Sequence, residues 1–414
     1  MRRFLIDLTP LRQSAPFRRL WLSSLLASLG GQMSVFAVAL QVYTITHSSI
    51  AVGLIGIFVA APMIAFALFG GTLADAIDKR KLVICVTSAQ IIVAGGLWLQ
   101  AGLNLDQVWI IYLLVAVQSG LGAIAVPARR TILSRLLPND SMPSALALYL
   151  FSSQAGLIAG PTLGGLLTAA VDIQFCFAAQ TLGFTASLLA AIRLPHLPND
   201  GSAPKPGLGA VLEGFRYLSK ASLIRSVFLA DLSITVLAIP TALLPQINDE
   251  RFGGSPETLG YLNSAIAIGG VLGIVFAGIV KATGAKGRGL LICGAAWGLF
   301  IIGFGLSPYI WLAVTFLALA GISDMLSVTF AQTLIQTNSP DELRGRVTSA
   351  EQIIQMGGPQ LGNLRAGLTG TWMGSETGVV VGGAATIVAL AIVGLSSTSL
   401  SRYRDRELPP LSRA

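Results

Sequence analysis

The sequence of 414 residues is poor in charge, with only 11% Asp, Glu, Lys and Arg. A soluble protein of this length needs more polar surface than that to cover its fold. Apolar residues make up 53% of the chain, and the mean hydropathy is +0.74. We therefore expect an all-α integral membrane protein, because unpaired backbone groups are not tolerated in ~30 Å of hydrocarbon.

Cysteine and histidine are also scarce. The three cysteines, Cys85, Cys176 and Cys293, lie inside apolar segments and predict no disulfide framework. The two histidines, His47 and His196, are far apart in the chain, which argues against a metal site. No Gly-rich ATP-binding loop and no catalytic cluster is present. We expect no enzyme activity, no cofactor and no direct coupling to ATP.

Long apolar runs fill most of the chain and predict twelve transmembrane helices. The expected spans are 17–45, 50–74, 81–102, 107–133, 142–170, 173–194, 223–248, 257–282, 288–306, 309–336, 343–371 and 376–399.

A Pro/Gly/Ser-rich stretch followed by a short interfacial helix, residues 194–222, separates the first six spans from the last six. The segment 131–147 lines up with 333–349, matching Thr131 to Thr333 and Pro138 to Pro340. Duplicated halves predict such a repeat. We expect two pseudo-symmetric six-helix bundles, 1–193 and 223–414, joined by a cytoplasmic linker.

Basic residues mark one side of the membrane. All but two of the 27 Lys and Arg residues lie in segments on the same side as the N-terminus, the exceptions being Arg251 and Arg365. Because Lys and Arg are retained in the cytoplasm, both termini are predicted to be cytoplasmic. Topology then accounts for the net charge of +8, and we expect lipid headgroups rather than nucleic acid as its partners. We expect a monomer.

The predicted cytoplasmic loop GGTLADAIDKRKLV, residues 70–83, concentrates charge between two apolar runs. Gly71 lets one helix approach another closely, while Asp75 can make charged contacts with Arg80 and Lys81 across a helix junction. These four residues are candidates for a cytoplasmic gate. The alternative is a short basic loop that only fixes topology.

The span 142–170 contains AGLIAGPTLGGLL. Glycines four residues apart form a flat surface for close helix packing, and a proline distorts the helix locally. The candidate residues are Gly156, Gly160, Pro161, Gly164 and Gly165. The alternative is ordinary glycine packing.

Both stretches resemble signatures of the major facilitator superfamily. The loop resembles its Gly-x-x-x-Asp-(Arg/Lys)-x-Gly-x-(Arg/Lys)-(Arg/Lys) latch, although Ala76 and Asp78 replace a basic residue and the second glycine. The glycine stretch resembles the Gly-x-x-x-Gly-Pro-x-x-Gly-Gly motif of the superfamily's exporters. An arginine of a third motif is missing, since Ala116 stands in its place. Further features are the entry PFRRLWLSSLLASLGG, the linker ending in EGFRYL, and QTNSPDELRGRV between the tenth and eleventh spans. With the GPTLGG motif, they make nearly the whole chain resemble the branch of siderophore and multidrug exporters.

This resemblance implies an inner-membrane transporter that exports a siderophore or an amphiphilic drug-like molecule by alternating access, driven by proton influx. An importer of a small solute is the alternative within transport, and the exporter motif disfavours it. A non-transporting membrane protein is a second alternative, disfavoured because no sizeable extramembrane domain is expected.

Ionisable residues inside spans are costly and therefore functional candidates. Asp324 lies near the middle of a span that lines the central cavity in the superfamily, where it can exchange a proton, hold a cationic substrate, or bond structurally to Ser323 or Ser327. Further proton-coupling candidates are Asp231 and Glu351. For Asp231, which lies near the inner end of its span, a solvated role at the inner mouth is the alternative.

Substrate-binding candidates include one charged residue. Arg365 can attract an anionic substrate or satisfy backbone carbonyls. The uncharged polar candidates on the cavity spans are Gln32, Gln41, Tyr43, Gln118 and Gln332.

Overall fold

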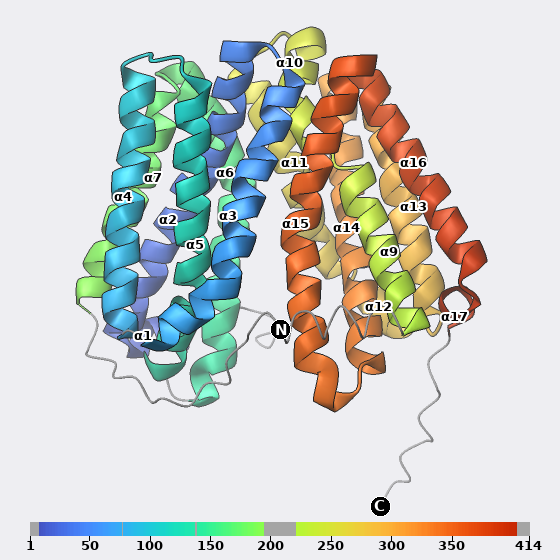
Figure 1. Cartoon of the computed structure of the whole chain (residues 1–414), viewed down its shortest axis with the longest axis horizontal. Helices are drawn as coiled ribbons and strands as arrows, with labels where there is room; N and C mark the ends of the chain where they lie inside the picture. The colour runs from blue at the N-terminus through green and yellow to red at the C-terminus, as the bar shows by residue number, and fades with distance from the viewer. Residues whose placement is uncertain (1–7, 77, 137–138, 194–220, 404–414) are drawn as a thin grey trace, which may run out of the picture.

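The computed structural model describes residues 8–76, 78–136, 139–193 and 221–403 (Figure 1). These residues form helices and connecting turns, and no β-strand occurs among them. The α-helices are α1 (Thr9–Gln13), α2 (Ala15–Thr46), α3 (Ser49–Ala76), α4 (Lys79–Gly102), α5 (Val108–Leu136), α6 (Met142–Ala170), α7 (Gln174–Ile192), α9 (Ser222–Leu237), α10 (Leu244–Phe252), α11 (Pro256–Val275), α12 (Gly278–Ala282), α13 (Lys286–Gly305), α14 (Ile310–Asn338), α15 (Asp341–Met373), α16 (Ser375–Ser396) and α17 (Thr398–Ser401). Two short 3-10 helices are η2 (Asn139–Ser141) and η3 (Thr241–Leu243).

The long helices stand side by side in two groups, one up to α7 and the other from α9 onward (Figure 1). In the first group α2 packs against α6 and α7, and α5 packs against α3 and α4. In the second group α14 packs against α11 and α13, while α9 packs against α15 and α16. The groups meet through two helix pairs, α6 with α11 and α3 with α15.

Eleven helical segments in the described part of the chain are long and apolar enough to cross a membrane. The helix α15, which covers the predicted span 343–371, is not among them although it has 33 residues. Its sequence begins with the charged stretch DELRGR and carries further charges in its interior. The protein is therefore a helical multi-pass membrane protein, and the count of twelve spans stays a prediction. The predicted linker, 194–222, lies almost entirely outside the described residues, so the bundle boundaries also stay predictions.

Two predicted spans are interrupted. The seventh, 223–248, consists of α9, a non-helical turn at 238–240, η3 and α10. Pro240 supplies the reason, since proline lacks the N–H that an α-helix needs and disfavours helical geometry in the residue before it. Pro245 lies in the first turn of α10, where proline is tolerated. The eighth, 257–282, ends as a regular helix at Val275 and continues as the short α12.

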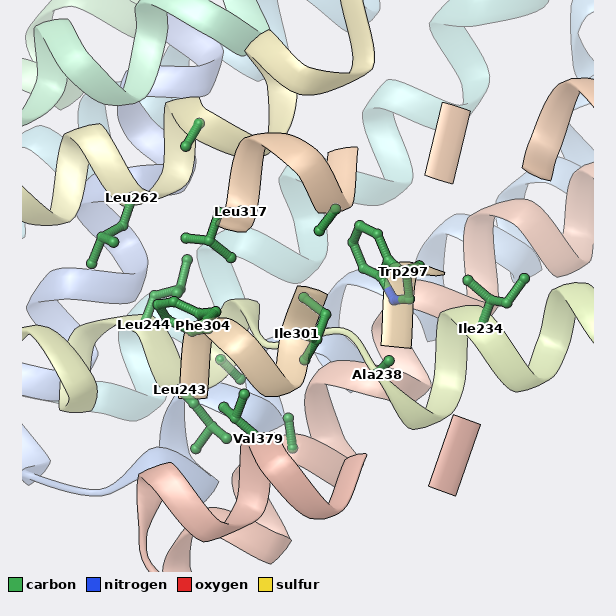
Figure 2. Close-up of a cluster of buried hydrophobic side chains, with 14 of the residues drawn as sticks. Ile234, Ala238, Leu243, Leu244, Leu262, Trp297, Ile301, Phe304, Leu317 and Val379 are labelled. Atoms are coloured by element: carbon green, nitrogen blue, oxygen red, sulfur yellow. The ribbon is translucent and has the colours of Figure 1, made fainter. Parts of the chain in front are cut away.

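A core of buried apolar side chains surrounds the break in the seventh segment (Figure 2). Ile234 and Leu244 from its two sides are at most 1% exposed, as are Ile301 and Phe304 of α13. In a bilayer such packing stabilises the fold by close van der Waals contact, because lipid tails are as apolar as the side chains they replace. The break is therefore a packed element of the second helix group.

Candidate functional site

Three acidic side chains from different helices lie together in the second helix group. Asp231 lies on α9, Asp324 on α14 and Glu351 on α15. Asp324 and Glu351 are both near enough to Asp231 to repel its charge. Asp231 is 4% exposed and Glu351 7%, while Asp324 is partly buried. The structure thus brings together all three predicted proton-coupling candidates, which are far apart in the sequence.

The hydrogen bonds of this acid cluster are few. Gln355, one turn after Glu351 on α15, donates its Nε2 to the Asp231 Oδ2 at 3.3 Å. The Glu351 Oε1 is buried and has no hydrogen-bond partner among the described residues. A buried carboxylate without partners is costly when ionised. The cluster is therefore suited to holding at least one proton.

The structural alternative for Asp324 required a bond from a neighbouring serine to its carboxylate. The Ser323 hydroxyl donates instead to the Leu319 carbonyl oxygen at 3.1 Å, and the Ser327 hydroxyl donates to the backbone carbonyl oxygen of Asp324 at 2.9 Å. Neither serine hydroxyl is used by the Asp324 side chain.

Arg365 of α15 lies at the break in the seventh segment. Its Nε donates to the Val236 carbonyl oxygen at 3.1 Å and its Nη2 to that of Ile239 at 3.3 Å. A third, longer bond of 3.5 Å joins its Nη1 to the Gly378 carbonyl oxygen. The last carbonyls of a helix have no partner within the helix, so the guanidinium satisfies groups that the end of α9 exposes. Of the two roles considered for Arg365, these contacts match the carbonyl-satisfying one.

Two of the uncharged candidates are bonded to other side chains. Gln41 on α2 exchanges two hydrogen bonds with Gln100 on α4, at 2.9 and 3.3 Å, and both amides are buried. The Tyr43 hydroxyl donates to the Asp249 Oδ2 at 3.2 Å. In this conformation neither side chain is free to bind a substrate.

The other three uncharged candidates are differently placed. Gln32 on α2 is partly buried and lies against Gly160 of α6. Gln118 on α5 has a buried Oε1 without a hydrogen-bond partner in the described part of the chain. Gln332 on α14 is exposed. The structure does not gather these three into one site.

The glycines of the exporter motif contact two helices. Gly156, Gly160 and Gly164 face α2, where an added Cβ would collide with Ser28, Gln32 and Phe36 respectively. Gly165 faces the start of α11, and the Thr162 hydroxyl donates to the Ser264 hydroxyl of α11 at 2.7 Å. The motif therefore packs α6 against its own group on one side and against the second group on the other.

Among the described residues, the two helix groups are in contact at the end of the molecule where α3 begins and α15 ends. A Cβ at Gly53 would lie 2.7 Å from the Asn363 carbonyl oxygen, and one at Gly56 would lie 2.6 Å from that of Gln360. At the same end the Ser49 hydroxyl donates to Gln246 of α10. With the bond from Tyr43 to Asp249, the short helix α10 is tied to both α2 and α3.

The helix α10 is also tied to its own group. The Ser375 hydroxyl donates to the Glu250 Oε2 at 2.5 Å, and Arg251 forms an ion pair with Glu376 of α16. Sequence reasoning treated this stretch as the end of a span and an outer loop. The sequence feature that could have indicated a separate helix here is the polar stretch QINDER directly after an apolar run.

The predicted cytoplasmic gate is described only in part. Gly71 and Asp75 lie near the end of α3, but the side chains of that stretch are outside the described residues. Asp78 caps α4 by accepting the Arg80 and Lys81 backbone N–H groups at 2.8 and 3.1 Å. The Arg80 Nη2 donates to the Ile192 carbonyl oxygen of α7, within the same helix group. The substitution of the superfamily's second glycine by Asp78 thus gives α4 a side-chain cap.

Neither a metal-binding group nor a titratable histidine occurs in the acid cluster. Among the described residues, no group of three His, Cys, Asp or Glu side chains is arranged to hold a metal ion. His47 follows α2 with a left-handed backbone (φ 47°), and His196 lies outside the described residues. The cluster consists of carboxyl groups and one amide.

Two helix groups around broken and glycine-packed helices, with buried acids in one group, define a membrane transporter of the major facilitator fold. Residues 6–411 match the family described as transmembrane secretion effector, so the chain belongs to that family. Its members are transporters rather than enzymes.

Curated relatives match over almost their whole length. The enterobactin exporter EntS of Shigella boydii serotype 18 (strain CDC 3083-94 / BS512) is 27% identical over 409 residues, covering 98% of this chain and 97% of that protein. The enterobactin exporter EntS of Escherichia coli O139:H28 (strain E24377A / ETEC) is 26% identical with the same coverage.

Solved transporters share the fold at low sequence identity. The nucleoside transporter NupG superposes with a TM-score of 0.73 at 16% identity, covering 92% of this chain and 98% of that one. A bacterial homologue of the human lysosomal transporter Spinster, in an inward-facing and unoccupied conformation, gives 0.71 at 16% identity, covering 95% and 98%. At these identities the likeness establishes the fold alone.

Proposed function

We propose that this transporter exports an amphiphilic small molecule, of the siderophore or drug-like class, across a bacterial inner membrane in exchange for protons. The glycine motif of α6 and the whole-length similarity to enterobactin exporters support export and a siderophore-like substrate. We further propose that the protein acts as a monomer and binds no nucleic acid.

The observation that supports proton coupling is the acid cluster. Asp231, Asp324 and Glu351 meet inside the second helix group, and no arginine or lysine of the described residues forms an ion pair with them. Asp324 and Glu351 are both near enough to repel the charge of Asp231, so ionisation of all three carboxylates is unfavourable. Opening the cluster to water on one side of the membrane lets it release a proton, and closing it favours uptake, which links protonation to the conformational change.

The contacts between the helix groups support alternating access. Both termini are proposed to be cytoplasmic, because the basic residues gather on that side. The closed end, where α10 meets α2 and α3, then faces the outside. In this proposal, the contacts at that end keep the outside closed while the transporter receives a substrate for export.

The test is transport by purified protein in liposomes with an imposed pH gradient. Asp324→Asn keeps the size and polarity of the side chain but removes its titration. We expect this variant to lose export driven by the pH gradient while retaining substrate binding and downhill exchange.

Asp106→Asn is the matched control, because Asp106 is exposed and its positive φ of 48° suits asparagine. It should transport like the parent. An unchanged gradient-driven rate in Asp324→Asn would exclude Asp324 from coupling. The same result in Asp231→Asn and in Glu351→Gln would remove the whole cluster from the mechanism.

A further inference from the structure

A hollow of about 180 Å³ lies in the first helix group, away from the acid cluster. It is bounded by α2, α6 and α7, and its lining residues are all uncharged. The residues are Ser24, Ala27, Ser28, Tyr149, Ser152, Ser153 and Phe184. Tyr149 and Ser153 are exposed, whereas Ser24 and Ser28 are partly buried, so the hollow opens to the surface of the helix group.

The serines of this hydroxyl pocket, as we call it, differ in what their hydroxyls do. A serine in a membrane helix commonly donates to a carbonyl of the preceding turn. Ser152 does so, donating to the Leu148 carbonyl oxygen at 3.2 Å, as does the neighbouring Ser23 to that of Leu20 at 2.9 Å. Among the described residues, by contrast, none bonds the hydroxyls of Ser24, Ser28 or Ser153.

The pocket lies on the opposite side of α2 from Leu26. Leu26, which is 52% exposed, lies about 160° around the helix from both Ser24 and Ser28. The face that carries the two serines continues through Gly31, where an added Cβ would meet nothing within 4 Å, to Val35, which is 63% exposed. The pocket therefore belongs to an open face of α2 on the side opposite Leu26.

Neighbouring contacts fix the shape of the pocket. Below it, the Trp21 Nε1 donates to the Leu148 carbonyl oxygen at 2.8 Å and holds α2 against α6. Above it, Gly156 of the exporter motif makes room for Ser28, since a Cβ there would collide with the Ser28 hydroxyl. The distance between α2 and α6 at the pocket is thus set by the contacts on either side of it.

We propose that the hydroxyl pocket is a binding subsite for an uncharged ring that carries hydroxyl groups, forming part of the exported substrate. Three unpartnered serine hydroxyls and the Tyr149 phenol can donate or accept hydrogen bonds, and Phe184 supplies an apolar ring. The absence of charge in the lining disfavours an ionised group, which would lose its hydration without gaining an ionic partner. This subsite rests on the proposed export function, but its binding needs no proton gradient.

Binding is measured by ligand-observed NMR with the full chain in lipid nanodiscs, with protein-free nanodiscs subtracted. The probes are resorcinol, benzoate and toluene, which share a ring and differ in hydroxyl groups and charge. Resorcinol should bind more tightly than either of the others. Equal or tighter binding of benzoate or toluene would overturn the chemical assignment.

The serine variants provide matched controls. Ser24→Ala, Ser28→Ala and Ser153→Ala each remove a free hydroxyl, and each should weaken resorcinol binding about fivefold. Ser23→Ala removes a hydroxyl outside the lining that is already bonded within its own helix, and it should bind within about twofold of the parent. If the three free-hydroxyl variants bind resorcinol as tightly as Ser23→Ala does, the pocket is not the subsite.

The outcome separates the subsite from the proposed function. Loss of gradient-driven export with intact resorcinol binding would refute proton-coupled export and leave the subsite standing. Intact export in the three free-hydroxyl variants, together with unchanged binding, would refute the subsite and leave the transporter mechanism standing.

Discussion

Replacing Arg365 tests whether this residue stabilises the broken seventh segment or contacts the substrate. Its guanidinium donates to the carbonyl oxygens of Val236 and Ile239, on either side of the point where α9 ends. A positive charge at a helix C-terminus also interacts favourably with the helix dipole. Arg365→Leu removes these interactions and leaves both carbonyls without that donor.

The expected magnitude follows from the two shorter bonds. A buried polar group that loses its partner costs ~1–3 kcal/mol, so Arg365→Leu should reduce the free energy of unfolding by ~2–6 kcal/mol. The third bond, at 3.5 Å, is at the limit of hydrogen-bond geometry and adds little. Arg365→Lys keeps the charge but lacks the planar fork, so it should fall between the parent and the leucine variant.

The measurement is the midpoint of unfolding in increasing mole fraction of SDS, followed by substrate binding to the remaining folded protein. Gly382→Ala is a second perturbation at the same place, because a Cβ there would lie 2.5 Å from the Leu237 carbonyl oxygen and 2.7 Å from the Arg365 Nη1. Since only the second collision involves Arg365, its effect should add to that of Arg365→Leu only in part. An Arg365→Leu variant that is as stable as the parent but no longer binds an anionic substrate would refute the structural role.

Three further predictions concern other contacts. Tyr43→Phe removes the bond to Asp249 across the closed end and should shift the conformational equilibrium about fivefold toward opening there. Spin-label distances across this end would measure the shift, and an unchanged distance distribution would show that the bond does not contribute to closure. Gly160→Leu should abolish transport by forcing α6 away from α2. Gly95→Ala should leave transport intact, because a Cβ there meets nothing within 4 Å. Normal export by Gly160→Leu would contradict close packing of α6 against α2. Asp78→Ala should destabilise the protein by ~1 kcal/mol, and Asp78→Gly by only a few tenths of a kcal/mol. Equal thermal unfolding midpoints of the two variants would contradict a capping role for Asp78.

The sequence alone predicted the helical membrane class, the superfamily and most span positions. These properties depend on local composition, since a run of about 20 apolar residues becomes a helix in lipid whatever its neighbours are. The glycine motif of α6 could also be predicted from the sequence, because glycines four residues apart form a flat helix surface whichever helix packs against it. The break in the seventh segment was missed although Pro240 marked it, because proline is common inside membrane helices and does not by itself reveal an interruption.

Only the tertiary structure decided which polar residues meet. The sequence named Asp231, Asp324 and Glu351 one by one, and their shared location depends on how α9, α14 and α15 pack. The same holds for Arg365, whose partners are carbonyls freed by a helix end that the sequence did not place. The free and bonded serines of the hydroxyl pocket look alike in sequence, because whether a hydroxyl turns back to its own helix or toward a hollow is set by the helices packed around it.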